Sequence, residues 1–135
     1  MRSIMMQIAT LWTMFGGAKM QQMLGNTMEK MVLIMTTFST AEDADAAIMH
    51  LLEQRAIACG SVLPGVTSTY RWNNAIERSS EVQVLLKAPL HLRDTTMETL
   101  ASIHPYEIPE IICIEPGAVH APYLAWTLDA CRSTT

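Results

Sequence analysis

The sequence predicts one α+β domain in which two strand–helix–strand units are followed by a C-terminal helix. Three observations predict it. A short apolar run rich in β-branched residues begins at Val32, helical periodicity follows from Ala41, and two-residue alternation replaces it after Gly60. Of the 135 residues 50% are apolar, so a single domain can bury a core of its own.

Residues 31–55 predict the first strand and the first helix. The run from Val32 to Met35 is typical of a strand that is buried on both faces. Ser39 and Glu42 have the spacing of a capping box, so we expect the Ser39 hydroxyl to accept a hydrogen bond from the first turn. The apolar face of this helix consists of Ala44, Ala47, Ile48, Leu51 and Leu52.

A long β-hairpin is predicted next. Polarity alternates from Val66 to Trp72 and again from Glu81 to Lys87, and Asn73-Asn74 between them is typical of a turn because Asn tolerates positive φ. Pro64-Gly65 indicates a bulge in the first arm. Each arm can run about ten residues, which is long for a small domain. We therefore expect the hairpin to project beyond its own core and to be covered by something else.

The second half of the chain predicts a helix, a strand and a last helix. A helical pattern from Leu90 to Ile103 ends at His104-Pro105, because a residue before proline avoids the α region. Residues 108–115 are predicted as a strand, and Pro109 near its start implies an edge position. Pro122 marks the first turn of the last helix. The order of elements is that of the split βαβ, ferredoxin-like arrangement.

Composition narrows the classes of partner. A net charge of −4 and the lack of a basic patch argue against nucleic acid. The apolar stretch from Ile4 to Phe15 is too short to span a bilayer, so no membrane partner is expected. Only 16% of the residues are charged, which indicates that a partner or another copy of the chain covers part of the surface.

The first 30 residues stand apart from the rest. Residues 1–31 contain eight of the eleven methionines. We interpret residues 1–30 as a Met-rich extension outside the fold and residues 31–135 as the folded domain. A signal peptide and a natural start of synthesis at Met28 or Met31 are the other interpretations.

Three widely spaced cysteines, Cys59, Cys113 and Cys131, do not form a disulfide pattern. Free cysteine is most often a small buried hydrophobe, so we expect reduced core thiols and a cytoplasmic location.

Several strings of residues together resemble the CutA (divalent-cation tolerance) family, in the order in which that family has them. The two most specific strings are LPGVTSTYRW over residues 63–72 and HPYEIPE over residues 104–110. The shorter matches are Ala58-Cys59, Glu81-Val82, Leu86-Lys87 and Tyr123-Leu124 with Trp126. The resemblance runs from about residue 31 to the end. It implies a homotrimer whose long hairpins wrap neighbouring subunits, a link to copper and other divalent cations, and no catalytic activity.

The chain departs from the family at the positions that the resemblance links to copper. Many bacterial members have a Cys at the end of the first strand and two consecutive histidines before the Pro-Tyr pair, whereas Met35, Ile103 and His104 occupy those positions here. Asn74-Ala75 also replaces the Gly-Lys that is usual in the hairpin turn.

Three residues are candidate ligands for copper or another divalent cation. His104 is the first, because imidazole suits copper, zinc and nickel; the alternative is that it caps the second helix by bonding its last carbonyls. Met35 has a thioether that suits Cu(I), and core filling is its alternative role. Glu110 is an oxygen donor, as is Glu107, although strand alternation would place these two carboxylates on opposite faces.

A second group of residues is expected at a subunit interface or in a cleft between subunits, because Tyr and Trp are enriched there. This group comprises Tyr70, Trp72, Tyr106, Trp126 and Lys87. Glu77, Glu81 and Lys87 on the hairpin are expected to form solvated or structural ion pairs, and pairing across a subunit boundary is the alternative.

The alternatives come from other functional classes. An enzyme is not favoured, because the chain has neither a phosphate-binding loop nor a spacing that indicates a catalytic triad or a carboxylate pair. A regulatory trimer similar to PII-type proteins would bind a nucleotide or anion in its clefts, for which Arg71, Arg78 and Lys87 are the candidate donors. A scaffolding trimer that binds metal only incidentally is the third possibility.

Overall fold

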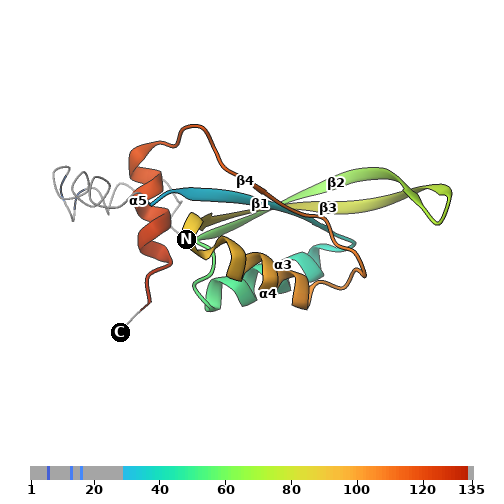
Figure 1. Ribbon diagram of the computed structural model, residues 1–135, viewed down its shortest axis with the longest axis horizontal. Helices are drawn as coiled ribbons and strands as arrows, with labels where there is room; N and C mark the ends of the chain where they lie inside the picture. The colour runs from blue at the N-terminus through green and yellow to red at the C-terminus, as the bar shows by residue number, and fades with distance from the viewer. Residues whose placement is uncertain (1–5, 7–12, 14–15, 17–28, 134–135) are drawn as a thin grey trace.

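The structure is a computed structural model that describes residues 6, 13, 16 and 29–133, and the prediction made for the N-terminal extension falls largely outside them. From residue 29 on, the elements are β1 (Met31–Phe38), α3 (Ala41–Glu53), β2 (Cys59–Trp72), β3 (Ala75–Pro89), a 3-10 turn η1 (Leu90–Leu92), α4 (Arg93–Ile103), β4 (Ile111–Ile114) and α5 (Ala121–Ala130) (Figure 1). This is the predicted order of strands and helices.

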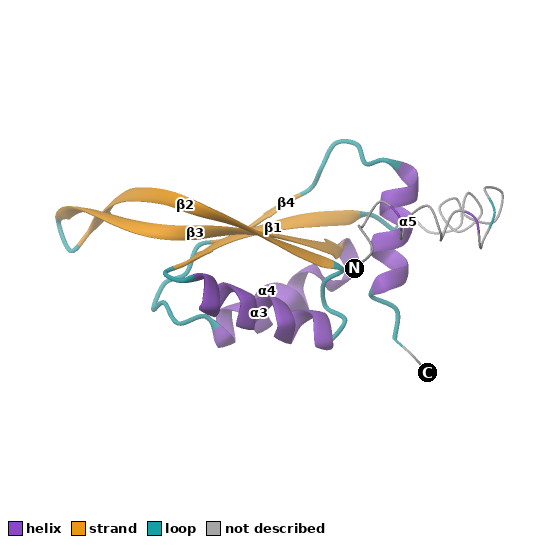
Figure 2. Ribbon diagram, turned by 180° about the vertical axis from the view of Figure 1, so that it is seen from behind, coloured by secondary structure: helices purple, strands orange, loops and turns teal. Residues whose placement is uncertain are grey.

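The four strands form one antiparallel sheet in the order β2-β3-β1-β4. β1 lies in the middle and pairs with β3 on one side and with β4 on the other. Figure 2 shows α3 and α4 on one face of this sheet. The edge position predicted for the last strand is confirmed, since β1 is the one strand of the described chain that pairs with β4.

The core lies between the sheet and the helix pair. Alternate residues of β1, among them Ile34 and Phe38, are buried toward α3, where Leu51 is buried in turn. This two-residue alternation results from the pleat, which points successive side chains to opposite faces. Burying each of these large side chains contributes about 1.5–3 kcal/mol.

α3 packs tightly against β2 at Gly60. A Cβ atom placed on Gly60 would meet three carbon atoms of the Ile48 side chain at 2.7–2.9 Å. The absence of a side chain at this position therefore sets how near the helix lies to the sheet.

The predicted hairpin is confirmed, and it projects beyond the helix layer (Figure 1). β1 pairs with β3 only as far as Val82, so beyond that point β2 and β3 pair with each other alone. Asn73 and Asn74 form the turn with φ values of 49° and 64°. The register shifts between Leu63 and Val66, at the predicted bulge.

Three boundaries differ from the predicted ones. Thr40 rather than Ser39 caps α3, because the Thr40 Oγ1 accepts the Asp43 amide (3.1 Å) while the Ser39 hydroxyl bonds Tyr106. The second helical pattern begins as the 3-10 turn η1 before α4 starts. β4 is shorter than the predicted strand, so residues 104–110 form a loop.

α5 lies at the end of the sheet opposite the hairpin tip, and Pro122 is in its first turn as predicted (Figures 1 and 2). None of the helices in the described part of the chain has the length and apolar character needed to cross a membrane.

The sheet face away from α3 and α4 carries a patch of apolar side chains, which we call the open face. Leu33, Met35 and Leu85 are half-buried on it. Leu63, Ile112 and Ile114 on the same face are 41–46% exposed. These six side chains are more exposed than core residues, and together they form a patch that is more apolar than a typical protein surface.

Candidate functional site

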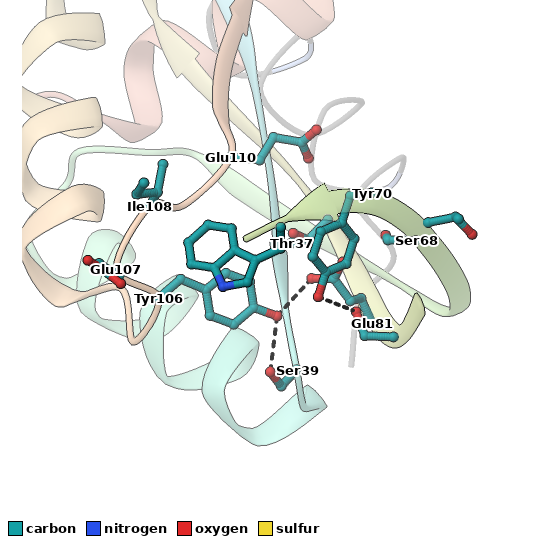
Figure 3. A pocket seen from close by; sticks show the side chains of 12 residues that line it. Thr37, Ser39, Ser68, Tyr70, Glu81, Tyr106, Glu107, Ile108 and Glu110 are labelled. Atoms are coloured by element: carbon teal, nitrogen blue, oxygen red, sulfur yellow. Dashed lines mark hydrogen bonds between the residues drawn. The ribbon is translucent and has the colours of Figure 1, made fainter. Parts of the chain in front are cut away.

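A cavity of about 720 Å³ lies where the hairpin passes the end of β1 and the loop 104–110 (Figure 3). β1 contributes Thr37, and Ser39 follows directly after the strand. β2 and β3 contribute residues from the part of the hairpin near and beyond Val82, and the loop contributes residues 106–108 and 110. The site therefore combines three segments that are far apart in the sequence.

Aromatic rings and hydroxyl groups form much of the lining. The rings are those of Tyr70, Trp72 and Tyr106. The hydroxyl groups are those of Thr37, Ser39, Ser68, Thr69 and Ser79. Ser68 pairs directly with Ser79 in the register, so alternation places these two hydroxyl groups on one face of the hairpin.

Three carboxylates complete the lining, and among the residues that the structure describes no Lys, Arg or His belongs to it. They are Glu81 on β3 and Glu107 and Glu110 in the loop. Figure 3 shows Glu81 on the strand side and Glu110 on the loop side. The prediction that Glu107 and Glu110 lie on opposite faces is wrong, because β4 begins only at Ile111 and strand alternation does not govern the loop.

Glu81 and Tyr106 are joined by a short hydrogen bond at the bottom of the site. The Tyr106 hydroxyl donates to the Glu81 Oε2 at 2.7 Å, and the Ser39 Oγ lies 3.0 Å from the same phenolic oxygen. Because the single phenolic proton is directed at the carboxylate, Ser39 is the donor to Tyr106. Burial raises the pKa of Tyr106 and the charge of Glu81 acts in the same direction, so the phenol keeps its proton.

Glu81 is ionised although it is only 9% exposed. Burial by itself raises the pKa of this carboxyl, but hydrogen bonds from Ser68, Tyr106 and Thr37 outweigh it, and the pKa is lowered. Within one chain the salt bridges of the described residues involve Arg93 and Arg132 and not Glu81, so pairing of Glu81 across a subunit boundary stays a prediction. Within the described part of the chain, the site thus holds a buried negative charge without a cationic side chain beside it.

His104 lies directly behind Tyr106 and is 8% exposed. Its Nε2 is 2.8 Å from the Thr37 carbonyl, and its Nδ1 accepts the backbone N–H of Tyr106 at 3.1 Å. The ring stacks on Phe38 with centroids 4.3 Å apart. His104 follows α4, but its side chain bonds β1 rather than the last carbonyls of the helix, so the capping interpretation is wrong.

The imidazole of His104 is neutral in this setting. A carbonyl can only accept and an amide can only donate, so the proton is on Nε2 and the lone pair on Nδ1. Burial lowers the pKa of His104, while the Thr37 carbonyl and the charges of Glu81 and Asp43 oppose that effect in part. Both ring nitrogens are thus already used, and a metal would have to displace one of these hydrogen bonds.

The three candidate metal ligands occupy different places. Glu110 lines the cavity, His104 lies behind it, and Met35 is half-buried on the open face opposite Leu85 and Ile112. Within the described part of the chain, no three His, Cys, Asp or Glu side chains gather closely enough to hold a metal ion.

The predicted cleft residues divide into two groups. Tyr70, Trp72 and Tyr106 are brought together in the cavity. Trp126 instead contacts Tyr123 on α5, with ring centroids 5.6 Å apart. Lys87 donates to Ser61 far from the hairpin turn, and the other two candidate anion donors, Arg71 and Arg78, do not line the cavity either.

Sequence reasoning did not place Glu81 and Ser39 in this site. Two-residue alternation puts Glu81 on the same face of the hairpin as Val66, Ser68 and Tyr70, and this pattern could have placed Glu81 in the site. Ser39 carried no such signal, because its partner Tyr106 is 67 residues away in the sequence.

Comparison with known proteins gives a consistent result. The family model described as "CutA1 divalent ion tolerance protein" matches residues 32–130. The "Divalent-cation tolerance protein CutA" of Thermus thermophilus is 34% identical over 99 residues, which are 73% of this chain and 94% of that protein. The protein of the same name from Citrobacter koseri is 36% identical over 98 residues, 73% of this chain and 84% of its own.

Solved structures agree with this. The crystal structure of the divalent ion tolerance protein CutA1 from Ehrlichia chaffeensis superposes with a TM-score of 0.76 and 32% identity, covering 79% of this chain and 100% of that one. CutA from Xylella fastidiosa superposes with a TM-score of 0.74 and 31% identity, and the match covers 76% of this chain and 99% of that one.

Proposed function

The chain belongs to the CutA1 divalent ion tolerance family, and from this membership we propose that it is a non-catalytic homotrimer that binds divalent cations. The observation that carries the proposal is the charge of the cavity, whose lining by described residues has three carboxylates and no basic residue. Carboxylate oxygens bind hard divalent cations, and uncompensated carboxylates raise the local concentration of any cation.

Copper or another divalent cation is the proposed ligand. Glu110 is proposed to bind it from the cavity, and His104 to supply nitrogen once the cation displaces one of its two hydrogen bonds. Met35 would add a soft thioether for Cu(I). Because the three residues are not assembled into one ligand set within a single chain, the proposal requires rearrangement or a donor from a second copy.

Two surfaces that are exposed in a single chain are the basis for proposing a trimer. The open face exposes Leu63, Ile112 and Ile114 by more than 40% each. The hairpin beyond Val82 leaves the outer edges of both its strands unpaired, and unpaired edges and apolar patches favour association. Self-association through these surfaces is the arrangement that the sequence resemblance implies.

A small-ligand function is the second candidate, and the size of the cavity favours it. Ligand pockets commonly measure about 300–1,000 Å³, and this cavity of about 720 Å³ is within that range. In that case the trimer would be a regulatory or scaffolding protein that responds to a small molecule or to a partner protein.

A cytoplasmic location is part of the same proposal. Cys59, Cys113 and Cys131 are all free thiols. Burial raises the pKa of Cys131 to about 11, which keeps that thiol protonated and unreactive.

The test is a calorimetric copper titration of chelator-treated protein at about pH 7, with the mass of the assembly measured by light scattering. We expect a mass three times the 15.0 kDa of one chain and a Kd of about 1 μM or below. His104→Ala and Glu110→Gln should weaken binding by at least about tenfold, whereas Glu98→Gln, an exposed residue of α4 that does not line the cavity, should not.

A different result would contradict a specific part of the proposal. Copper binding that both variants retain unchanged would exclude these two residues as ligands. A monomeric mass would exclude the trimer.

A further inference from the structure

We propose that Cys59 and Lys87 form a covalent sulfur–nitrogen bond when a peroxide oxidises the protein, and that this bond clamps the base of the hairpin. Cys59 is the first residue of β2 and Lys87 lies near the end of β3, and neither residue lines the cavity. The reaction involves no metal ion and no bound ligand, so the proposal is independent of the cation binding proposed above.

The Lys87 side chain reaches the sulfur of Cys59. The Lys87 Nζ is 3.9 Å from the Cys59 Sγ, and the same ammonium group donates a hydrogen bond to the Ser61 Oγ. Cys59 and Lys87 are direct partners in the register of β2 and β3, so their side chains leave the sheet on the same face. Two paired strands, rather than a loop, therefore hold the amine next to the sulfur.

No acidic side chain among the described residues competes for the Lys87 amine. Lysine is mostly an exposed residue, whereas Lys87 is half-buried. The salt bridges of the described residues involve Arg93 and Arg132, so Lys87 is in none of them. Its side-chain partners are a sulfur and a hydroxyl group, and neither holds it as a carboxylate would.

α5 of the same chain packs against this end of the sheet, opposite the hairpin tip (Figure 1). Burial raises the pKa of Tyr123 on α5, and the neighbouring Cys59 adds to that effect, which places α5 beside the pair. The bond joins two side chains of one chain, so a neighbouring copy on the open face contributes no atom to it. Hydrogen peroxide is small enough to reach a half-buried thiol.

The first step is oxidation of the thiol. The Cys59 sulfur attacks one oxygen of hydrogen peroxide, the O–O bond breaks, and the products are a sulfenic acid and water. The sulfur loses two electrons, which reduce the peroxide. A sulfenic acid condenses even with an amide nitrogen to form a sulfenamide, and an amine is a stronger nucleophile than an amide. Lys87 provides that amine.

The second step is condensation. The Lys87 nitrogen attacks the sulfur, an N–S bond forms and the S–O bond breaks. The hydroxyl group leaves as water with one proton of the ammonium group, a second proton goes to solvent, and the third stays on the nitrogen. No further electrons are transferred. Two molecules of a small thiol reverse the step, because they become a disulfide and return Cys59 as a thiol and Lys87 as an amine.

The bond closes the hairpin at its base. Residues 60–86, between the two linked positions, contain the bulge, the Asn73-Asn74 turn and the hairpin residues that line the cavity. A covalent link that closes a loop restricts the unfolded chain and so stabilises the folded one. Oxidation also removes the positive charge of Lys87. The pair is thus a reversible redox clamp on the element that carries the cavity.

The test is mass spectrometry of the full chain, which is reduced, freed of reductant, treated with chelator and then exposed to hydrogen peroxide. Under denaturing conditions the chain should be lighter by two hydrogen atoms. Trypsin should release residues 56–71 joined to residues 79–93, because the modified Lys87 is no longer a cleavage site. A thiol should separate the two peptides again. The oxidised protein should melt about 5 °C or more above the reduced one.

Two variants link the reaction to this pair. Lys87→Arg keeps a positive charge and hydrogen-bond donors but lacks the amine, so it should abolish the joined peptide. Cys113→Ser is the matched control and should retain it, because Cys113 is also half-buried but has Arg93 near it rather than a lysine. Peptide mapping of the unaltered chain needs no variant, so a folding defect in Lys87→Arg leaves that measurement intact.

Three results would overturn the proposal. One is recovery of Cys59 only as a thiol or a sulfinic acid, with trypsin still cutting after Lys87. Another is an equal yield of the joined peptide in urea-unfolded protein, which would show that the folded contact plays no part. The third is a doubled mass under denaturing conditions, which would place the amine in a neighbouring copy. Each result is independent of whether the chain binds copper.

Discussion

At the residue scale, the decisive contacts are those of His104. The sequence marks this residue as a metal ligand or a helix cap, yet its two ring nitrogens join the Thr37 carbonyl of β1 to the Tyr106 amide of the loop. The neutral ring thereby fixes the loop that carries the cavity's carboxylates against the central strand. If Nδ1 were protonated, its N–H would face the backbone N–H of Tyr106. Two donors cannot bond each other, so the hydrogen bond between His104 and Tyr106 would break.

This geometry predicts an acid-sensitive stability in metal-free protein. The pKa of folded His104 lies below the ordinary 6.5, so below pH 6.5 the unfolded chain binds more protons than the folded one. The contribution of His104 is complete above the unfolded pKa and is lost as pH falls from 6.5 toward the folded pKa. We expect the free energy of unfolding, measured with denaturant, to decrease over this window.

The control is His104→Asn, which cannot titrate there and should flatten the profile between about pH 7 and pH 5. Glu81 acts in the same direction only at lower pH, because its pKa is lowered from 4.5. An identical slope in the variant and in the unaltered protein would contradict the assignment to His104.

At the element scale, the contact of α3 with β2 depends on a single hydrogen atom in place of a side chain. Gly60 is half-buried beneath Ile48, whose side chain is itself branched and buried. A methyl group at Gly60 has no free space, since all three contacts would be shorter than 3.0 Å. The helix can accommodate it only by moving away from the sheet or by changing the rotamer of Ile48.

Gly60→Ala is therefore expected to lower the free energy of unfolding by about 1–3 kcal/mol, the usual cost of overpacking a core. Gly117→Ala is the matched control, because nothing lies within 4 Å of a Cβ at that position. Chemical denaturation of both variants checks the prediction. Equal stability of the two would show that α3 shifts at no cost.

At the scale of the whole molecule, one face of the sheet forms the core and the other face stays open. The packed side is supported by α3 and α4, whereas Ile112 and Ile114 of the open face remain more than 40% exposed. The cavity lies between the hairpin, the end of β1 and the loop 104–110. Association through the open face would therefore bring the cavity close to a second copy, so assembly and ligand access are expected to influence each other.

The N-terminal boundary of the fold predicts how far the chain can be shortened without loss of stability. The Lys30 carbonyl accepts the Leu90 amide at 2.7 Å, and β1 begins at Met31. A chain of residues 28–135 is expected to keep its assembly mass per chain and a melting temperature within about 4 °C of the full chain, which corresponds to about 1 kcal/mol or less. Thermal unfolding and light scattering measure both. A larger drop would show that the removed residues stabilise the fold.

The sequence by itself determined the order of the elements, the hairpin with its Asn73-Asn74 turn and its bulge, and the edge position of β4. Each of these depends on neighbours within a few residues: on alternation, on positive φ at Asn and Gly, or on the missing N–H of proline. It also singled out Tyr70, Trp72 and Tyr106, which line the cavity, although it predicted them for a subunit interface or cleft, and that role stays a prediction.

Only the tertiary structure decided which of these residues meet. Glu81 contacts Tyr106 across 25 positions, Ser39 contacts the same hydroxyl across 67, and His104 reaches Thr37 across 67. Periodicity tells which face a side chain is on, but not which loop will fold over that face, and residues 104–110 have no period of their own. The buried charge of Glu81 and the neutrality of His104 follow from those long-range contacts, because a pKa responds to burial and to nearby partners rather than to sequence neighbours.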